Sequence, residues 1–95
     1  MPRARFIVRG RVQGVNFRAT AVREASRLGL TGRVWNRQDG AVGLLAEGDA
    51  QALAALEHWL WRGSRSAEVD AVERADAPGE PRYDGFDVSW GPAAE

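Results

Sequence analysis

The chain has 95 residues, enough for one domain with a single core, and its 44% hydrophobic and 27% charged residues are ordinary for a globular protein. Thirteen basic and thirteen acidic residues give a formal net charge of zero, which argues against a general nucleic-acid or membrane binder. Cysteine and lysine are absent, so a thiolate nucleophile, the lysine of a nucleotide-binding P-loop and Schiff-base chemistry are excluded. With one histidine and scattered acidic residues, we expect no metal site and no cofactor.

The start of the chain carries no recognisable targeting signal. Residues 1–4 lead directly into an expected strand, without the apolar core of a signal peptide. The longest apolar runs are only a few residues, too short to span a membrane. We therefore expect a cytoplasmic protein.

Hydrophobic periodicity predicts five strands and two helices. In chain order they are strand 5–12, helix 18–28, strands 32–38 and 41–47, helix 50–62, strand 67–74 and a short last strand with Phe86, Val88 and Trp90. Asp39-Gly40 is a strong signal for a two-residue hairpin loop, and Asp49 is suited to cap the second helix. The fourth strand breaks strict alternation, which indicates a bulge. We expect residues 91–95 to be frayed.

The element order β-α-β-β-α-β with a short extra strand is typical of the ferredoxin-like fold. We therefore predict one α+β domain over residues 1–95. In this fold a single antiparallel sheet carries both helices on one face. The fold alone does not define a function, because many unrelated activities use it.

The most informative stretch is Gly-Arg-Val-Gln-Gly-Val-Asn-Phe-Arg at residues 10–18, between the first strand and the first helix. Glycines allow positive φ angles, and successive backbone N–H groups in such a turn can converge on an anion. The helix that follows directs its free N–H groups and the positive end of its dipole to the same place. Arg18 adds a planar guanidinium suited to phosphate. The stretch is therefore consistent with a phosphate site, although most glycine turns before helices bind nothing.

Asn36 is the second candidate. It has the parity of Val34 on the second strand, so we expect both side chains on the helix-covered face, just before the hairpin. Its amide can hold and orient a water molecule. A strand-end asparagine bonded only to nearby backbone is the commoner case.

Together these segments resemble the acylphosphatase family. The resemblance is carried by residues 10–18, by Leu-Gly-Leu-Thr-Gly-Arg-Val-Trp-Asn-Arg-Gln-Asp-Gly at 28–40, by Glu47-Gly48, by Gly63-Ser64 with Ala67 and Val69, and by Gly85-Phe86. It covers about residues 5–90 in the family's order. Asn16 stands at a position where the family varies, and Arg33 and Trp35 are exchanged relative to the usual order. Neither departure touches the expected site chemistry.

The resemblance implies a metal-independent enzyme that hydrolyses small acyl phosphates to a carboxylate and inorganic phosphate. We expect a monomer that binds neither nucleic acid nor a membrane. It implies that Arg18 and the backbone amides of Gly14, Val15, Asn16 and Phe17 bind the phosphate. It also implies that Asn36 orients the attacking water.

Two alternatives stay open. The sheet face opposite the helices is expected to display one aromatic residue among basic ones, which could bind RNA or a nucleotide. These residues are Arg5, Arg9, Arg11, Arg33, Trp35 and Arg37. The chain could instead be an acylphosphatase-like module from a larger carbamoyl-transfer protein, although it ends soon after the last strand, which favours a free-standing enzyme.

Four other residues invite functional roles that their positions do not favour. His58 lies opposite the leucine stripe of the second helix, so we expect a solvated surface residue. Trp59 and Trp61 flank that stripe, and we expect both to be partly buried. Asp39 is explained by its turn.

Overall fold

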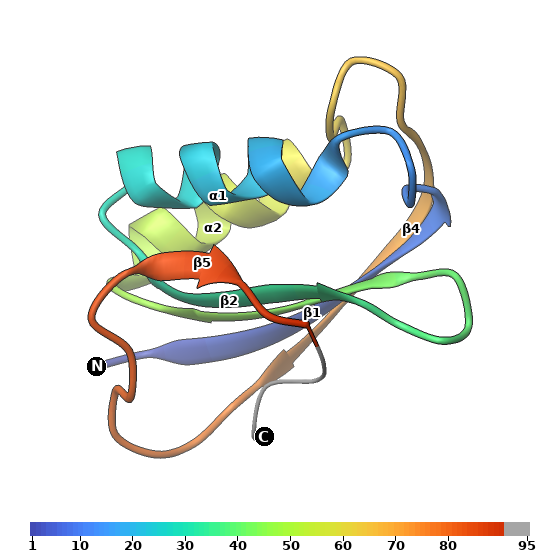
Figure 1. The fold of residues 1–95 in the computed structure, drawn as a ribbon. Coiled ribbons are helices and arrows are strands. Elements are labelled where there is room, and N and C mark those ends of the chain that lie inside the picture. Colours follow the sequence, from blue (N-terminus) through green and yellow to red (C-terminus); the bar gives the residue numbers. More distant parts are fainter. Residues whose placement is uncertain (91–95) are drawn as a thin grey trace.

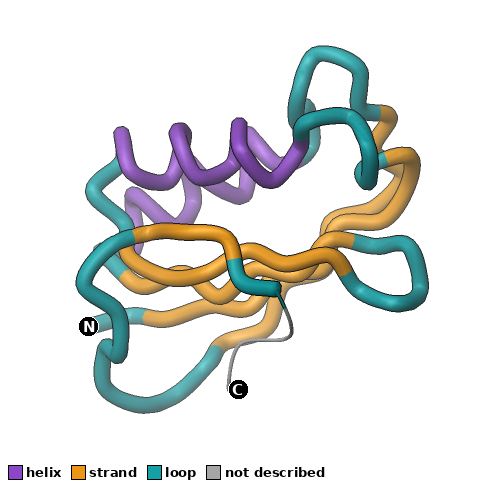
Figure 2. Tube along the Cα trace, viewed as in Figure 1, coloured by secondary structure: helices purple, strands orange, loops and turns teal. Residues whose placement is uncertain are grey.

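The seven predicted elements are present in the computed structural model, which describes residues 1–90 (Figures 1 and 2). The strands are β1 (Arg3–Arg11), β2 (Thr31–Asn36), β3 (Val42–Glu47), β4 (Glu68–Asp76) and β5 (Phe86–Val88), and the helices are α1 (Phe17–Arg27) and α2 (Ala50–Leu60). Trp90, expected in the last strand, lies just beyond it. The expected frayed tail, residues 91–95, lies outside the described residues.

The five strands form one sheet in the order β4-β1-β3-β2-β5. β1 pairs antiparallel with both β3 and β4, and β2 pairs antiparallel with β3. β5 pairs in parallel with β2, so the sheet is mixed rather than wholly antiparallel. Figure 1 shows both helices on one face of the sheet. This arrangement confirms the ferredoxin-like α+β fold.

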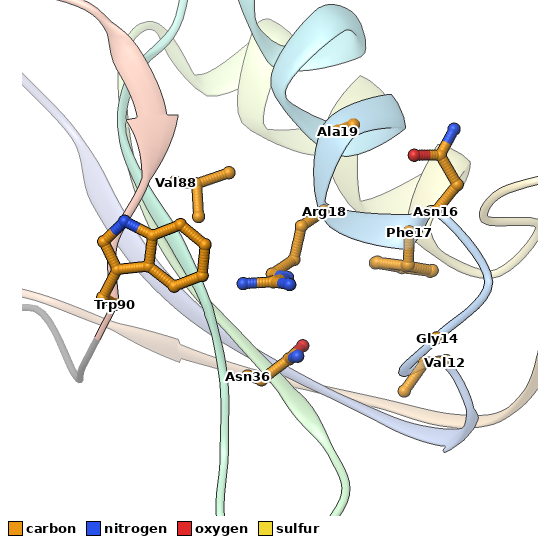
Figure 3. Close-up of a pocket in the computed structure, with 9 residues that line it drawn as sticks. All are labelled: Val12, Gly14, Asn16, Phe17, Arg18, Ala19, Asn36, Val88 and Trp90. Atoms are coloured by element: carbon orange, nitrogen blue, oxygen red, sulfur yellow. The ribbon is translucent and has the colours of Figure 1, made fainter.

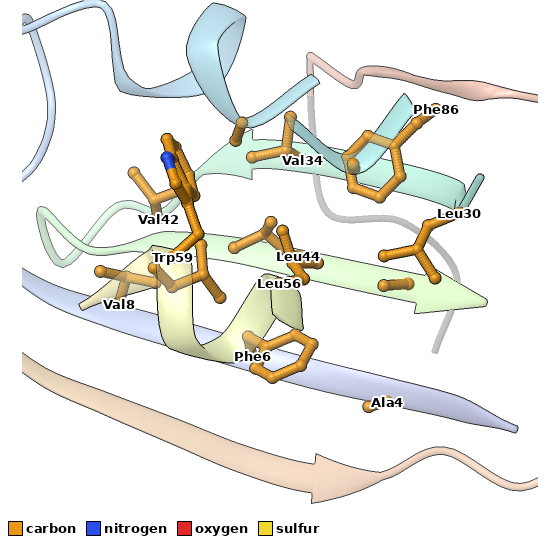
Figure 4. Packing of buried hydrophobic residues seen from close by; sticks show 14 of the residues in the cluster. Ala4, Phe6, Val8, Leu30, Val34, Val42, Leu44, Leu56, Trp59 and Phe86 are labelled. Carbon is orange, nitrogen blue, oxygen red and sulfur yellow. The ribbon is translucent and has the colours of Figure 1, made fainter. Parts of the chain in front are cut away.

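The core lies between that face and the two helices (Figure 4). Phe6 and Val8, which alternate along β1 and so share one face of the strand, are both buried. The leucine stripe of α2, Leu53, Leu56 and Leu60, is fully buried. Each such leucine contributes about 1.5–3 kcal/mol by leaving water, so this stripe is what fixes α2 against the sheet.

The ends of α2 follow the local sequence signals. The Asp49 side chain accepts a hydrogen bond from the Ala52 N–H at 2.8 Å, which confirms it as the N-cap. His58 is exposed and Trp59 is buried. Trp61, expected to be partly buried like Trp59, is 52% exposed and is not part of the core. Trp61 is the C-cap residue of α2 and does not continue the buried stripe.

The β2–β3 hairpin has a longer loop than predicted. The Arg37 N–H donates to the Ala41 carbonyl at 2.8 Å, which leaves Gln38, Asp39 and Gly40 in a three-residue loop. Gly40 has a φ of 89°, the left-handed conformation that follows a tight turn in loops of this length. Asp39 accepts a hydrogen bond from the Ala41 N–H at 3.1 Å, so its assignment to the turn is confirmed.

The irregularity predicted in the fourth strand is also present. Arg9 pairs with Ala71 and Gly10 with Val69, so Asp70 is an extra residue opposite β1. This bulge explains why the apolar positions of β4 fall out of alternation.

The sheet face opposite the helices is not an open aromatic platform. Trp35 is only 2% exposed and packs with Leu45, Ala77 and Tyr83 in a second, smaller cluster. The guanidinium carbon of Arg33 lies 4.4 Å from the centre of the Tyr83 ring. The chain after β4 therefore covers the indole on which a base would have to stack. Sequence periodicity could not show this, because the covering residues come from a loop.

Candidate active site

The loop between β1 and α1 holds its backbone in left-handed conformations. Gly14 has a φ of 74° and Asn16, the N-cap of α1, has a φ of 63°. Asn16 is the one non-glycine residue with positive φ within residues 1–90, and asparagine tolerates this conformation better than most residues. Its side chain makes no capping hydrogen bond. The first N–H groups of α1 are therefore left for another partner.

Hydrogen bonds turn the carbonyl groups of Val15 and Asn16 away from that open end. The Ser64 hydroxyl donates to the Val15 carbonyl at 2.7 Å, and Ser64 itself is buried. The Asn16 carbonyl accepts from the Thr20 hydroxyl at 2.8 Å and from the Thr20 N–H at 3.3 Å. In a trans peptide the N–H points opposite to the C=O, so the N–H groups of Asn16 and Phe17 point away from these donors. The loop thus presents donors rather than acceptors.

Gln13 connects this loop to the β2–β3 hairpin. Its side-chain nitrogen donates to the carbonyls of Arg37 at 2.8 Å and Ala41 at 2.9 Å. Those carbonyls close the hairpin immediately after Asn36. Gln13 therefore sets how far the loop lies from Asn36. The roles of Gln13 and Ser64 were not predicted, and their only sequence signal is a place in or beside the motifs that resemble the family.

A cavity of about 240 Å³ opens between the loop, the first turn of α1 and the ends of β2 and β5 (Figure 3). Nine residues line it: Val12, Gly14, Asn16, Phe17, Arg18, Ala19, Asn36, Val88 and Trp90. Figure 3 shows the side chains of Arg18 and Asn36 directed into the same space. Five of the six predicted site residues line this cavity; Val15 does not, since its side chain packs against the core.

The cavity is suited to an anion. Arg18 forms no ion pair with a carboxylate in the described part of the chain, and its guanidinium carbon lies 5.4 Å from the centre of the Trp90 ring. No acidic side chain is among the nine residues that line the cavity. The open N-terminus of α1 adds its partial positive charge on the same side. An unpaired arginine beside free backbone N–H groups is the arrangement that binds phosphate.

Residues 1–90 contain no group of three or more His, Cys, Asp or Glu side chains that could hold a metal ion. Neither of the two helices is long and apolar enough to cross a membrane.

The fold and the cavity are those of a small ferredoxin-like α+β protein with a cavity suited to an anion at the N-terminus of its first helix. Comparison with known proteins identifies the family. The acylphosphatase family profile matches residues 4–88, and the chain belongs to this family.

Individual relatives agree with this assignment. The chain is 48% identical over 84 residues to the acylphosphatase of Xanthomonas oryzae pv. oryzae, covering 88% of this chain and 96% of that protein. The crystal structure of acylphosphatase from Bacillus subtilis superposes with a TM-score of 0.91 at 36% identity, covering 95% of this chain and all of that one. The chain also resembles part of HypF from T. kodakarensis, with a TM-score of 0.81 at 27% identity, covering 95% of this chain and 12% of HypF.

Proposed function

We propose that this acylphosphatase hydrolyses acyl phosphates to a carboxylate and inorganic phosphate, with Arg18 and the loop amides binding the phosphoryl group and Asn36 orienting the water. The observation that carries the proposal is the shared cavity, in which an unpaired arginine and an amide side chain face the same space beside open backbone N–H groups. The amides assigned to phosphate binding are those of Gly14, Val15, Asn16 and Phe17.

The chemistry needs little beyond positioning. An acyl phosphate already carries a good carboxylate leaving group, so catalysis consists mainly of orientation and charge stabilisation. The water oxygen forms a bond to phosphorus while the bond from phosphorus to the acyl oxygen breaks, and the carboxylate leaves with that electron pair. With no acidic or histidine side chain lining the cavity, we assign the proton of the water to a phosphoryl oxygen. Arg18 and the amides stabilise the charge on the equatorial oxygens.

The alternative function, RNA or nucleotide binding on the sheet face opposite the helices, is less well supported than hydrolysis, because Trp35 is buried. Monomeric state, cytoplasmic location and independence of metal stay predictions. Activity on benzoyl phosphate in the presence of a chelator tests the last of these.

Two substitutions separate the proposed roles. Arg18→Ala should lower turnover of benzoyl phosphate by on the order of 10²-fold and weaken inhibition by inorganic phosphate, because phosphate loses its charged partner. Asn36→Ala should lower kcat while leaving inhibition by phosphate near the wild-type value, because it removes only the water's partner. Arg23→Ala is the matched control, since Arg23 is exposed on α1 and does not line the cavity. Near-normal turnover by Arg18→Ala and Asn36→Ala would refute the assignment.

A further inference from the structure

The cavity has a second, apolar side that phosphate binding does not use. Phe86, Val88 and Trp90 share one parity along β5 and beyond it. Phe86 is buried in the core at 7% exposure, Val88 is half-buried, and Trp90 is 91% exposed. This row of side chains therefore emerges from the core and ends as an open apolar surface at the cavity mouth.

Trp90 is the most exposed large hydrophobic residue among residues 1–90. An indole is large and apolar, so leaving it in water forgoes a substantial stabilisation. The guanidinium carbon of Arg18 lies 5.4 Å from the centre of the Trp90 ring. One exposed apolar residue needs no explanation by itself, but this one lines the proposed active site together with Val88.

The indole of Trp90 lies where it can contact a substrate bound as in the proposed function, on which this step rests. Figure 3 shows the loop with Gly14 on one side of Arg18 and Trp90 on the other. A substrate whose phosphoryl group is held by the loop and Arg18 would have room for its acyl group on the far side of Arg18. The lining residues on that side are Val88 and Trp90.

We propose that Trp90 and Val88 form an acyl-group subsite that favours planar aromatic acyl phosphates over short aliphatic ones. An aromatic ring stacks on the exposed indole, removing apolar surface of both partners from water. An acetyl group is too small to cover the ring and gains little. Trp90 is thus a specificity-determining residue for the proposed reaction.

The test compares benzoyl phosphate with acetyl phosphate in wild type, Trp90→Ala and Trp90→Phe. Expressing each variant's kcat/KM as a fraction of wild type for the same substrate cancels the different intrinsic reactivities. Trp90→Ala should lower the value for benzoyl phosphate by about tenfold and that for acetyl phosphate by less than about twofold. Trp90→Phe, which keeps a ring, should retain most of the benzoyl phosphate activity. Trp61→Ala is the control, because Trp61 is also exposed but does not line the cavity.

Inhibition by inorganic phosphate separates this subsite from a role in holding Arg18. The subsite requires an unchanged inhibition constant in Trp90→Ala. Equal losses for both substrates with weaker inhibition by phosphate would mean that Trp90 only positions Arg18, which overturns the proposal. Unchanged activity on both substrates also overturns it.

A binding measurement keeps the inference separate from the proposed function. If wild type hydrolyses neither substrate, the proposed function fails, and calorimetry with benzoylphosphonate and acetylphosphonate decides the subsite alone. Tighter binding of benzoylphosphonate by wild type, lost in Trp90→Ala, supports the subsite. Equal binding of the two phosphonates overturns it.

Discussion

We expect Glu47→Gln to lower the free energy of unfolding at pH 7 by about 3 kcal/mol. Glu47 is fully buried at the end of β3, and its carboxylate accepts four hydrogen bonds. The donors are Arg3 Nε at 2.9 Å, the Thr31 hydroxyl at 2.8 Å, and the backbone N–H groups of Arg82 at 2.7 Å and Tyr83 at 3.1 Å. They come from β1, β2 and the loop before β5, so one carboxylate joins three segments distant in sequence.

The magnitude follows from what glutamine can still accept. Its amide has one acceptor oxygen and an NH2 group, so about two of the four donors face another donor. Each buried donor left unsatisfied costs roughly 1–3 kcal/mol, and removing one partner of a buried ion pair costs about 3–5 kcal/mol. We take the lower part of this range because Arg3 keeps the carbonyls of Ala77 at 3.5 Å and Pro78 at 3.2 Å. In a domain of this size the melting temperature should fall by roughly 12–24 °C.

Urea and thermal denaturation followed by circular dichroism measure this loss. Glu73→Gln is the matched control, because it makes the same chemical change at an exposed ion pair. In that pair Arg9 Nε lies 2.6 Å from a carboxylate oxygen of Glu73. Exposed pairs contribute at most about 1 kcal/mol, so this variant should be nearly as stable as wild type. Equal stabilities for Glu47→Gln and Glu73→Gln would refute the reasoning.

The same carboxylate predicts a pH dependence. Burial alone would raise the pKa of Glu47, but the hydrogen bonds from Arg82, Thr31, Arg3 and Tyr83 outweigh it and hold the pKa below its ordinary value. The carboxylate therefore contributes its full stabilisation above the unfolded pKa of about 4.3, and this is lost as pH falls through the lower folded pKa. The difference in unfolding free energy between wild type and Glu47→Gln should shrink in acid below that range.

Two further substitutions test the scaffold of the site. Gln13→Met keeps side-chain length but loses both bonds to the hairpin, so kcat for benzoyl phosphate should fall about tenfold with an unchanged circular dichroism spectrum; wild-type kcat would contradict the bridge. Gly32→Ala should prevent folding, because a Cβ there would lie 1.8 Å from the Leu45 carbonyl oxygen at a φ of 147°. A cooperative unfolding transition in Gly32→Ala would show that the strands can separate to accept it.

Most of the fold was predictable because its signals are local. The alternation of Phe6 and Val8, the leucine stripe of α2 and the cap at Asp49 each depend on residues a few positions apart. The hairpin was predicted with too short a loop, because Asp39-Gly40 fits more than one turn geometry and only the backbone pairing distinguishes them. The burial of Trp35 was missed, because the loop that covers it carries no periodic pattern.

Some features of the candidate site also follow from local sequence, and others depend on the tertiary structure. The amino-acid sequence by itself determined an open helix N-terminus with Arg18 in its first turn, and it placed Asn36 on the helix-covered face by strand parity. Only the tertiary structure decided that Ser64 turns the Val15 carbonyl away and that Gln13 ties the loop to the hairpin. Only it placed Trp90 beside Arg18. These contacts join residues tens of positions apart through single hydrogen bonds or ring contacts, and no spacing along the chain encodes them.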